Sequence, residues 1–533
     1  MPPAHPPGRV FPWLPIVAAV LFAVTHTQPP LYYSNQNQYF LHGLAAAGYG
    51  DLRTDWLANT RDPTPVFSAG IALADRACGE WAFHAAFFAL LVVYFLGLWS
   101  VAAVLPFRPI TTAGRVALAG GLIVVHSAAV RVLSVKLVGV DYPWYAQAGV
   151  ANQYLLGAGL QPSVFGVLLL VALAAFAGKR YVAAGAFCAA ACVFHSTYLL
   201  PAGLLVAGMC LGLLLSSQIG GAMRVGTVAL VGVLPVIAYT LSTFAPSSPE
   251  QFTEAQKVLA WVRIPHHTDV HRWLDGVAWV QIVWAGAGLI AFRRTPLFFP
   301  LAVAAVVALL LSVAQVWSGN ATFALMFPWR ISALLVPLAT AAALTGLACF
   351  VERIPAGRVI AASIGLTAVA AVGGAAWVYA EHLGYQGSAA EDGLQRHVAQ
   401  TRQPGDVYLL PCGFPKPPAA RGSAAATFVP VPQTGRPAVF ELQRFRLATG
   451  AATFVDFKSV PYQDAEVLEW RRRVTACERW YATERWDETG VMDEVRADDV
   501  THVVVPAGVH VTSKWLTETY ADAAYHVYRL EQK

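Results

Sequence analysis

The sequence predicts a polytopic α-helical membrane protein, with about eleven transmembrane helices and a C-terminal extracytoplasmic α/β domain. The chain of 533 residues is 56% hydrophobic but only 13% charged, and its mean hydropathy is +0.52. These values lie outside the range of ordinary soluble domains. The apolar residues form long blocks as far as Tyr379, after which the charge density becomes ordinary. We therefore expect a transmembrane domain, residues 1–380, and an extracytoplasmic domain, residues 381–533.

Most apolar blocks approach the length of roughly 17–25 residues that a helix needs to cross a hydrocarbon core. The first block lies close to Met1, but no small-residue cleavage site follows it, so we expect a retained anchor. The blocks at 114–129 and 181–194 are short and would need tilting or extension by flanking residues. The predicted spans are residues 11–27, 81–105, 114–129, 163–177, 181–194, 199–215, 225–244, 277–292, 297–317, 327–350 and 359–379.

Basic residues in the short loops set the predicted orientation. With a cytoplasmic N-terminus, nearly every cytoplasmic loop holds Arg or Lys, for example Arg108, Arg224 and Arg293. An odd number of spans then places the C-terminal domain outside, on the same face as the first polar loop. Few Lys against many Ala and Arg suggests a bacterium, so we expect a multi-pass protein of the bacterial cytoplasmic membrane. The net charge of +5 follows from this topology, and no nucleic-acid partner is expected.

The C-terminal domain alternates strand and helix signals, which favours a largely parallel sheet. Cys412 and Cys477 lie here, and the sequence leaves open whether they pair in an oxidising compartment. No Gly-rich phosphate loop, nucleophile elbow or zinc spacing is found, so a lid or acceptor-recognition module is favoured over a catalytic one. We expect strands at 452–457, 501–505 and 525–530, and helices at 392–401, 465–474, 491–496 and 513–520, and an apolar run lies at 407–410.

Three carboxylates in the first polar loop are the best clue to function: Asp51, Asp55 and Asp62. Carboxylates at the edge of a bilayer are costly unless water or chemistry keeps them there. One could act as a general base towards a hydroxyl or amide, and two or three could hold a divalent cation such as Mg²⁺ or Mn²⁺. Alternatively, Asp51 and Asp62 cap turns or helices. Asp55, next to Trp56, is the preferred catalytic candidate.

Basic side chains gather in later loops on the same predicted face. Arg263, His266 and His267 could bind an anionic phosphate through charge-assisted hydrogen bonds, hold a metal, or form a solvent-exposed surface. Arg330 lies at the outer end of a span, where its guanidinium could bind phosphate bidentately or extend to the headgroups. His195, at the end of another span, could add a donor or be a buried hydrogen-bonded residue.

This layout resembles the GT-C superfamily of membrane glycosyltransferases, and an uncharacterised bacterial family built in the same way. The resemblance covers the topology of the whole chain and is specific over short motifs: Asn35-Gln-Asn-Gln-Tyr, Asp55-Trp-Leu-Ala, Asp62-Pro-Thr-Pro, His195-Ser-Thr-Tyr and Phe327-Pro-Trp-Arg. It implies a catalytic aspartate in the first outer loop, with Asp55 preferred to Asp51 and Asp62. It also implies that basic residues contact the carrier phosphate, the candidates being Arg330, Arg263, His266, His267 and His195.

The resemblance implies an inverting hexosyl- or pentosyltransferase that moves a sugar from a polyprenyl-phosphate or diphosphate carrier to an extracytoplasmic acceptor. Its partners would be the lipid-linked donor and membrane lipid. The chain lacks the paired Asp-Glu of protein mannosyltransferases and the Trp-Trp-Asp motif of oligosaccharyltransferases, so the acceptor is open. Two other classes fit the sequence: a transporter or flippase of a lipid-linked or anionic solute, and a non-catalytic cell-envelope scaffold.

Overall fold

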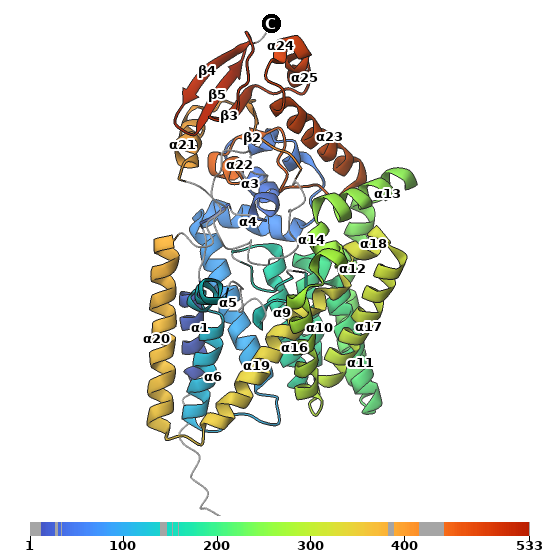
Figure 1. Ribbon diagram of the computed structural model, residues 1–533. Coiled ribbons are helices and arrows are strands. Elements are labelled where there is room, and N and C mark those ends of the chain that lie inside the picture. The colour runs from blue at the N-terminus through green and yellow to red at the C-terminus, as the bar shows by residue number, and fades with distance from the viewer. Residues whose placement is uncertain are drawn as a thin grey trace, which may run out of the picture.

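The chain folds into a bundle of apolar helices that carries a smaller, sheet-containing region at one end (Figure 1). The computed structural model describes residues 12–26, 30–32, 35–138, 146–151, 153–157, 159–381, 389–414 and 442–531. The Pro-, Ala- and Gly-rich stretch at 415–437, which the sequence predicts to be a long loop, lies outside these residues.

Six helical segments in the described residues are long and apolar enough to cross a membrane, so the chain is a multi-pass membrane protein by helix length and hydropathy. Two of the six join a short turn or helix to the main helix, namely α11 (Leu199–Leu215) and α19 (Ser332–Val351). The segments are Trp81–Ala102 (α5), Ser196–Leu215, Ile219–Thr243 (α12), Phe298–Ser318 (α17), Ala321–Val351 and Ala356–Trp377 within α20 (Ala356–Glu381).

Five further predicted spans are also apolar helices, but shorter ones. The helices run from 11 residues in α9 to 17 in α16, against about 20 for a full crossing. They pack against the longer helices, as α10 does against α12 and α6 against α20. Their bounds are Leu14–Thr25 (α1), Thr112–Val125 (α6), Val167–Ala177 (α9) after the turn Pro162–Gly166, Tyr181–Phe194 (α10) and Gly276–Phe292 (α16), and α7 (Ala128–Val138) follows α6.

The polar loops gather at one end of the bundle, between the apolar helices and the sheet (Figure 1). The first loop forms short helices: α2 (Gln36–Tyr39), α3 (Leu41–Ala47), the 3₁₀ turns η1 (Leu52–Thr54) and η2 (Leu57–Asn59), and α4 (Pro65–Cys78). A second loop contributes α13 (Pro249–Lys257), the π-helical turn η5 (Val258–Arg263), α14 (Pro265–Thr268) and α15 (Val270–Trp273). A third contributes α18 (Ala321–Leu325) and the turn η6 (Pro328–Ile331).

The C-terminal region contains a five-stranded sheet with the order β2-β1-β3-β5-β4. Strand β1 is parallel to β2 and β3, whereas β5 is antiparallel to β3 and β4, so the sheet is mixed and not largely parallel as predicted. The strands are Val407–Leu409 (β1), Ala452–Thr453 (β2), His502–Pro506 (β3), Leu516–Ala521 (β4) and Tyr525–Leu530 (β5). The helices are Glu391–Thr401 (α21), Phe445–Thr449 (α22), Asp464–Tyr481 (α23), Trp486–Thr489 (α24) and Val491–Ala497 (α25).

The prediction of a helix at 513–520 is wrong, because strand β4 occupies most of this segment. Its sequence alternates Thr517, Glu518 and Thr519, and β-branched residues favour an extended backbone. The Asp522 carboxylate accepts hydrogen bonds from the backbone of Ala524 (2.7 Å) and Tyr525 (2.8 Å), which closes a hairpin. The antiparallel β4–β5 pair that results also makes the sheet mixed.

Cys412 and Cys477 are both buried free thiols, and their side chains are hydrogen-bonded to each other. The Cys477 thiol also donates to the carbonyl oxygen of Leu410 at 3.1 Å. Whether they pair in an oxidising compartment, which the sequence left open, stays open.

Two glycines bring the first loop and the C-terminal region into backbone contact. Gly50 (φ 53°) and Gly450 (φ 67°) both have left-handed backbones, and the Asp51 amide donates to the Gly450 carbonyl at 2.8 Å. A Cβ on Gly50 would lie 2.7 Å from the Cα of Gly450. This junction therefore depends on the absence of side chains.

Replacing Gly50 by alanine is expected to lower the free energy of unfolding by about 2–4 kcal/mol, because overpacking adds to left-handed backbone strain. Gly319→Ala is the matched control, since Gly319 also has a positive φ (60°) but has open space around it. It should cost only about 1–2 kcal/mol. Urea unfolding of both variants in detergent measures the difference, and equal losses would show that the junction tolerates a side chain.

Candidate functional site

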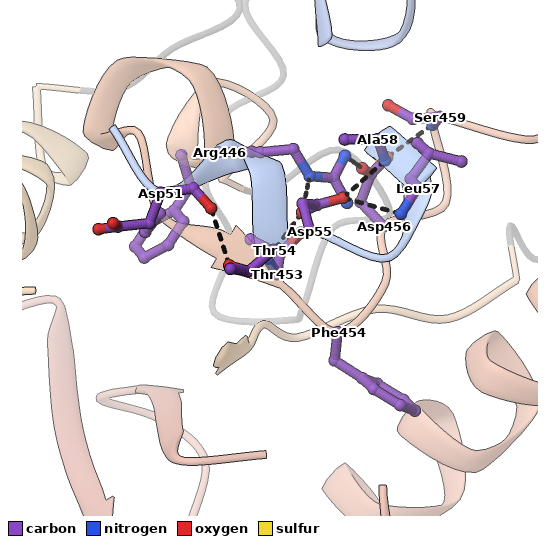
Figure 2. Close-up of polar contacts among 12 residues, drawn as sticks. Asp51, Thr54, Asp55, Leu57, Ala58, Arg446, Thr453, Phe454, Asp456 and Ser459 are labelled. Atoms are coloured by element: carbon purple, nitrogen blue, oxygen red, sulfur yellow. Dashed lines mark hydrogen bonds and ion pairs between the residues drawn. The ribbon is translucent and has the colours of Figure 1, made fainter. Parts of the chain in front are cut away.

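Asp55 lies between η1 and η2 with a fully buried side chain. Its Oδ1 atom accepts from the backbone amides of Leu57 (2.9 Å) and Ala58 (3.3 Å), and so caps the second turn. Its Oδ2 atom accepts from the backbone amide of Thr453 (2.9 Å) and from Nε of Arg446 (2.8 Å). The carboxylate thereby ties the first loop to β2 and α22 of the C-terminal region (Figure 2).

Arg446 is the buried centre of an ion triad, with Asp55 on one side and Asp456 on the other (Figure 2). Its Nη1 atom donates to Oδ2 of Asp456, whose Oδ1 accepts from the amide of Ser459 at 2.6 Å. Burial alone would lower the pKa of Arg446, but the two carboxylates outweigh it and the pKa is raised. The triad therefore holds a fixed positive charge between two negative ones.

The other two predicted acids have separate partners. Asp51 pairs with Nε of Arg402 at 3.2 Å. Asp62 accepts from the amide of Thr64 at 2.8 Å through Oδ1, the local turn expected of an aspartate in a loop. Among the described residues, no group of three or more His, Cys, Asp or Glu is arranged to hold a metal ion. Thus the structure does not bring the three carboxylates together, and their catalytic role stays a prediction.

Three basic side chains from distant segments lie near enough to His267 for their charges to act on it, and we call them the basic cluster: Arg263, Arg330 and Lys458. Burial lowers the pKa of His267 to about 3, with further lowering by the positive charges of all three residues. Burial and the charge of Arg263 lower the pKa of Lys458 to about 7, while Asp456 opposes this effect. The cluster thus concentrates positive charge where the second loop, η6 and the segment after β2 meet.

The hydrogen-bonding capacity of the basic cluster is only partly used. Arg263 donates through Nη2 to the carbonyl oxygen of Lys458, and Arg330 donates through Nη1 to Oγ1 of Thr197 at 2.7 Å. The Nε atoms of both arginines are buried, and neither has a hydrogen-bond partner among the described residues. Buried guanidinium donors without partners are costly. An anion is the kind of ligand that would satisfy such donors.

A chain of polar side chains connects the cluster to the first loop. Thr197 bonds to Nδ1 of the buried His195, and Nε2 of His195 lies 3.4 Å from the Tyr39 hydroxyl. Tyr39 lies 3.2 Å from the Tyr462 hydroxyl, which accepts from Nε2 of Gln38 at 2.9 Å. Gln38 and Tyr39, which end the Asn35-Gln-Asn-Gln-Tyr motif of the first loop, therefore lie at the site.

The predicted basic residues take different places. Arg263, Arg330 and His267 come together, and His195 joins them through Thr197. His266 is exposed, and its ring packs against that of His267 with centroids 4.1 Å apart. Nδ1 of His267 lies 2.6 Å from the carbonyl oxygen of Ala151, to which it can donate. His267 therefore makes contacts inside the protein and is not part of a plain solvent-exposed surface. No metal-binding group of His, Cys, Asp or Glu is found in the described residues of this loop.

Sequence reasoning missed Lys458, Asp456, Arg446 and Tyr462, all from the C-terminal region. A signal for two of them existed, because Asp456 and Lys458 stand at the end of a strand predicted at 452–457, where charged residues often belong to sites. No local signal marks Arg446, whose partner Asp55 is 391 positions away in the chain.

Comparison with known proteins matches residues 427–477 to a domain of unknown function, DUF6798. A search of curated proteins finds no match to the chain. The described part of the matched segment, residues 442–477, contains Arg446, Asp456, Lys458 and Tyr462. The segment of this chain that is similar to DUF6798 thus supplies the C-terminal share of both the ion triad and the basic cluster.

Proposed function

We propose that this protein is a membrane glycosyltransferase that takes a sugar from a polyprenyl-phosphate or diphosphate carrier and passes it to an acceptor outside the cytoplasm. The basic cluster binds the carrier phosphate. The proposal includes the GT-C-like layout of about eleven spans, with the C-terminal region on the outer face of a bacterial cytoplasmic membrane.

The observation that carries this proposal is the pair of buried, unpartnered Nε donors on Arg263 and Arg330. Four basic groups, these two with Lys458 and Arg446, face two carboxylates, Asp55 and Asp456, which leaves an excess of positive charge. A phosphate at the cluster would offset that charge, and it would accept from the free donors once the side chains that bury them move aside. Guanidinium groups suit phosphate because their planar donor pattern matches its oxygens.

A lipid-linked phosphate is favoured over a soluble one by the position of Arg330. This residue lies in Ala321–Val351, one of the six segments apolar enough to cross a membrane. A carrier whose chain lies among the apolar helices would present its phosphate at this depth. As the carrier leaves the sugar, negative charge develops on the phosphate, and fixed cations there would stabilise it.

The loops that form the polar site gather at one end of the helix bundle (Figure 1). This position favours sugar transfer at a membrane face and disfavours a transporter. Transporters commonly place polar residues near the bilayer midplane. The junction of the first loop with the C-terminal region instead suits a site that receives an acceptor from solution.

Arg263→Gln and Arg330→Gln are each expected to weaken binding of polyprenyl phosphate by about 10- to 100-fold, because each removes charge-assisted hydrogen bonds worth about 1.5–3 kcal/mol. Native mass spectrometry of the purified protein in detergent measures this, with polyprenol as the ligand that lacks phosphate. Arg471→Gln is the control, since Arg471 pairs on the surface with Glu254 at 2.6 Å.

Label transfer from a radiolabelled polyprenyl-phosphate sugar, in membranes of a deletion strain that expresses each variant, tests the reaction itself. Both arginine variants should lose transfer, and the Arg471 control should keep it. Equal binding of polyprenol and polyprenyl phosphate, or full transfer by both arginine variants, would overturn the proposal.

A further inference from the structure

We propose that Asp456, from the C-terminal region, is the carboxylate that takes the proton from the acceptor, and that Asp55 acts through Arg446 as a positioning residue. This inference rests on the proposed function, and it assigns a catalytic residue outside the first loop.

The two carboxylates of the triad differ in the acceptor capacity they have left. An ionised carboxylate has about four acceptor positions. Asp55 uses four, with donors from Leu57, Ala58, Thr453 and Arg446. Asp456 uses two, with donors from Arg446 and Ser459, so it can still accept a hydrogen bond from an incoming hydroxyl.

Access to solvent differs in the same direction. The Asp55 side chain is 0% exposed, whereas that of Asp456 is 23% exposed. A substrate hydroxyl can therefore reach Asp456 without breaking the packing around the triad, but it cannot reach Asp55. A general base must come within hydrogen-bond distance of the proton it removes.

The position of Asp456 relative to the basic cluster also fits. Its charge acts on both Arg263 and Lys458, and Lys458 follows it by two residues. The backbone between them is fixed from both sides, because Trp470 donates through Nε1 to the Asp456 carbonyl (3.0 Å) and Arg263 donates to that of Lys458. Asp456 is thus held next to the site proposed for the carrier phosphate.

In the proposed step, the acceptor O–H gives its proton to Asp456 while its oxygen bonds to the anomeric carbon of the sugar. The bond from that carbon to the carrier phosphate oxygen breaks, and its electron pair stays on the phosphate beside Arg263 and Arg330. Asp456 then releases the proton to water. Arg446 shares one positive charge between two carboxylates, so a net negative charge remains on the pair.

Asp456→Asn is expected to lower label transfer by about 10²–10⁴-fold, the usual contribution of general-base catalysis, while polyprenyl-phosphate binding stays within about threefold of wild type. Asp456→Glu should restore part of the rate. Asp498→Asn is the matched control: its side chain is 18% exposed, it pairs with Arg472 at 2.7 Å, and it should transfer normally.

Asp55→Asn separates the two carboxylates. It should lower stability, and the molecules that stay folded should keep more transfer than Asp456→Asn keeps. The inference is overturned if Asp456→Asn transfers as well as wild type, or if folded Asp55→Asn loses as much transfer as Asp456→Asn. If wild type itself neither binds the carrier phosphate nor transfers sugar, the proposed function fails instead.

Discussion

Arg446→Met is expected to lower the free energy of unfolding of the junction by about 3–5 kcal/mol, because it removes one partner of a buried ion pair. Asp55 would keep a charge in a site with no exposure, and Asp456 would lose its only side-chain donor among the described residues. By the usual conversion, the folded-to-unfolded ratio would fall by about 10²–10⁴-fold. Three buried tryptophans of the C-terminal region, Trp470, Trp480 and Trp486, report the transition by fluorescence during urea unfolding.

Two further variants separate charge from packing. In Asp55→Leu/Arg446→Met the unpaired buried charge is removed, so the double variant should be more stable than Arg446→Met alone. Arg471→Met breaks an exposed pair and should cost about 0–1 kcal/mol. If Arg446→Met unfolds at the same urea concentration as Arg471→Met, the triad does not hold the two parts together.

Hydropathy was sufficient to locate the eleven apolar helices found in the described residues, because helices among lipid or other apolar helices need apolar residues on every side. It was not sufficient to give the bounds of every helix, since capping and packing set where a helix begins and ends: α6, predicted at 114–129, runs from Thr112 to Val125 after its N-cap Thr111. The C-terminal strands at 501–505 and 525–530 were also correctly predicted, from continuous β-branched and alternating residues. Strand β4 was missed because its edge position leaves most of its side chains exposed, so no apolar alternation marks it.

The site was predicted in part, and its missing half has a physical explanation. Arg263, Arg330 and His267 were recognisable because charged groups beside apolar spans are unusual. Lys458 and Asp456 come from a region of ordinary charge density, where single charged residues carry no such signal. Trp56, which favoured Asp55 in the sequence, instead packs under the Arg473 guanidinium at 4.4 Å and helps to join the first loop to α23.

Lys458→Met is expected to stabilise the ligand-free protein by about 1–3 kcal/mol at pH 7. One pKa unit corresponds to about 1.4 kcal/mol, and water at the partly buried ammonium screens some of the penalty. The pKa of Lys458 is about 7 in the folded protein and 10.5 ordinarily, so between these values the unfolded chain binds more protons. Wild-type stability should therefore rise with pH across this window. The advantage of Lys458→Met should be largest at or below pH 7 and vanish near pH 10.5. Thermal unfolding at several pH values measures both.

The same substitution should weaken binding of polyprenyl phosphate, because a bound phosphate favours the charged ammonium. In wild type, affinity should fall as pH rises above 7, by at most tenfold per unit, whereas in Lys458→Met it should stay nearly flat. The phosphate itself contributes little there, since its second pKa is about 6. If Lys458 serves to bind a ligand, Lys458→Met should be more stable than wild type but bind polyprenyl phosphate more weakly. If Lys458 is structural, the variant should be less stable and its affinity should be unchanged. That second pattern would remove Lys458 from the basic cluster, whose remaining free donors would be the Nε atoms of Arg263 and Arg330.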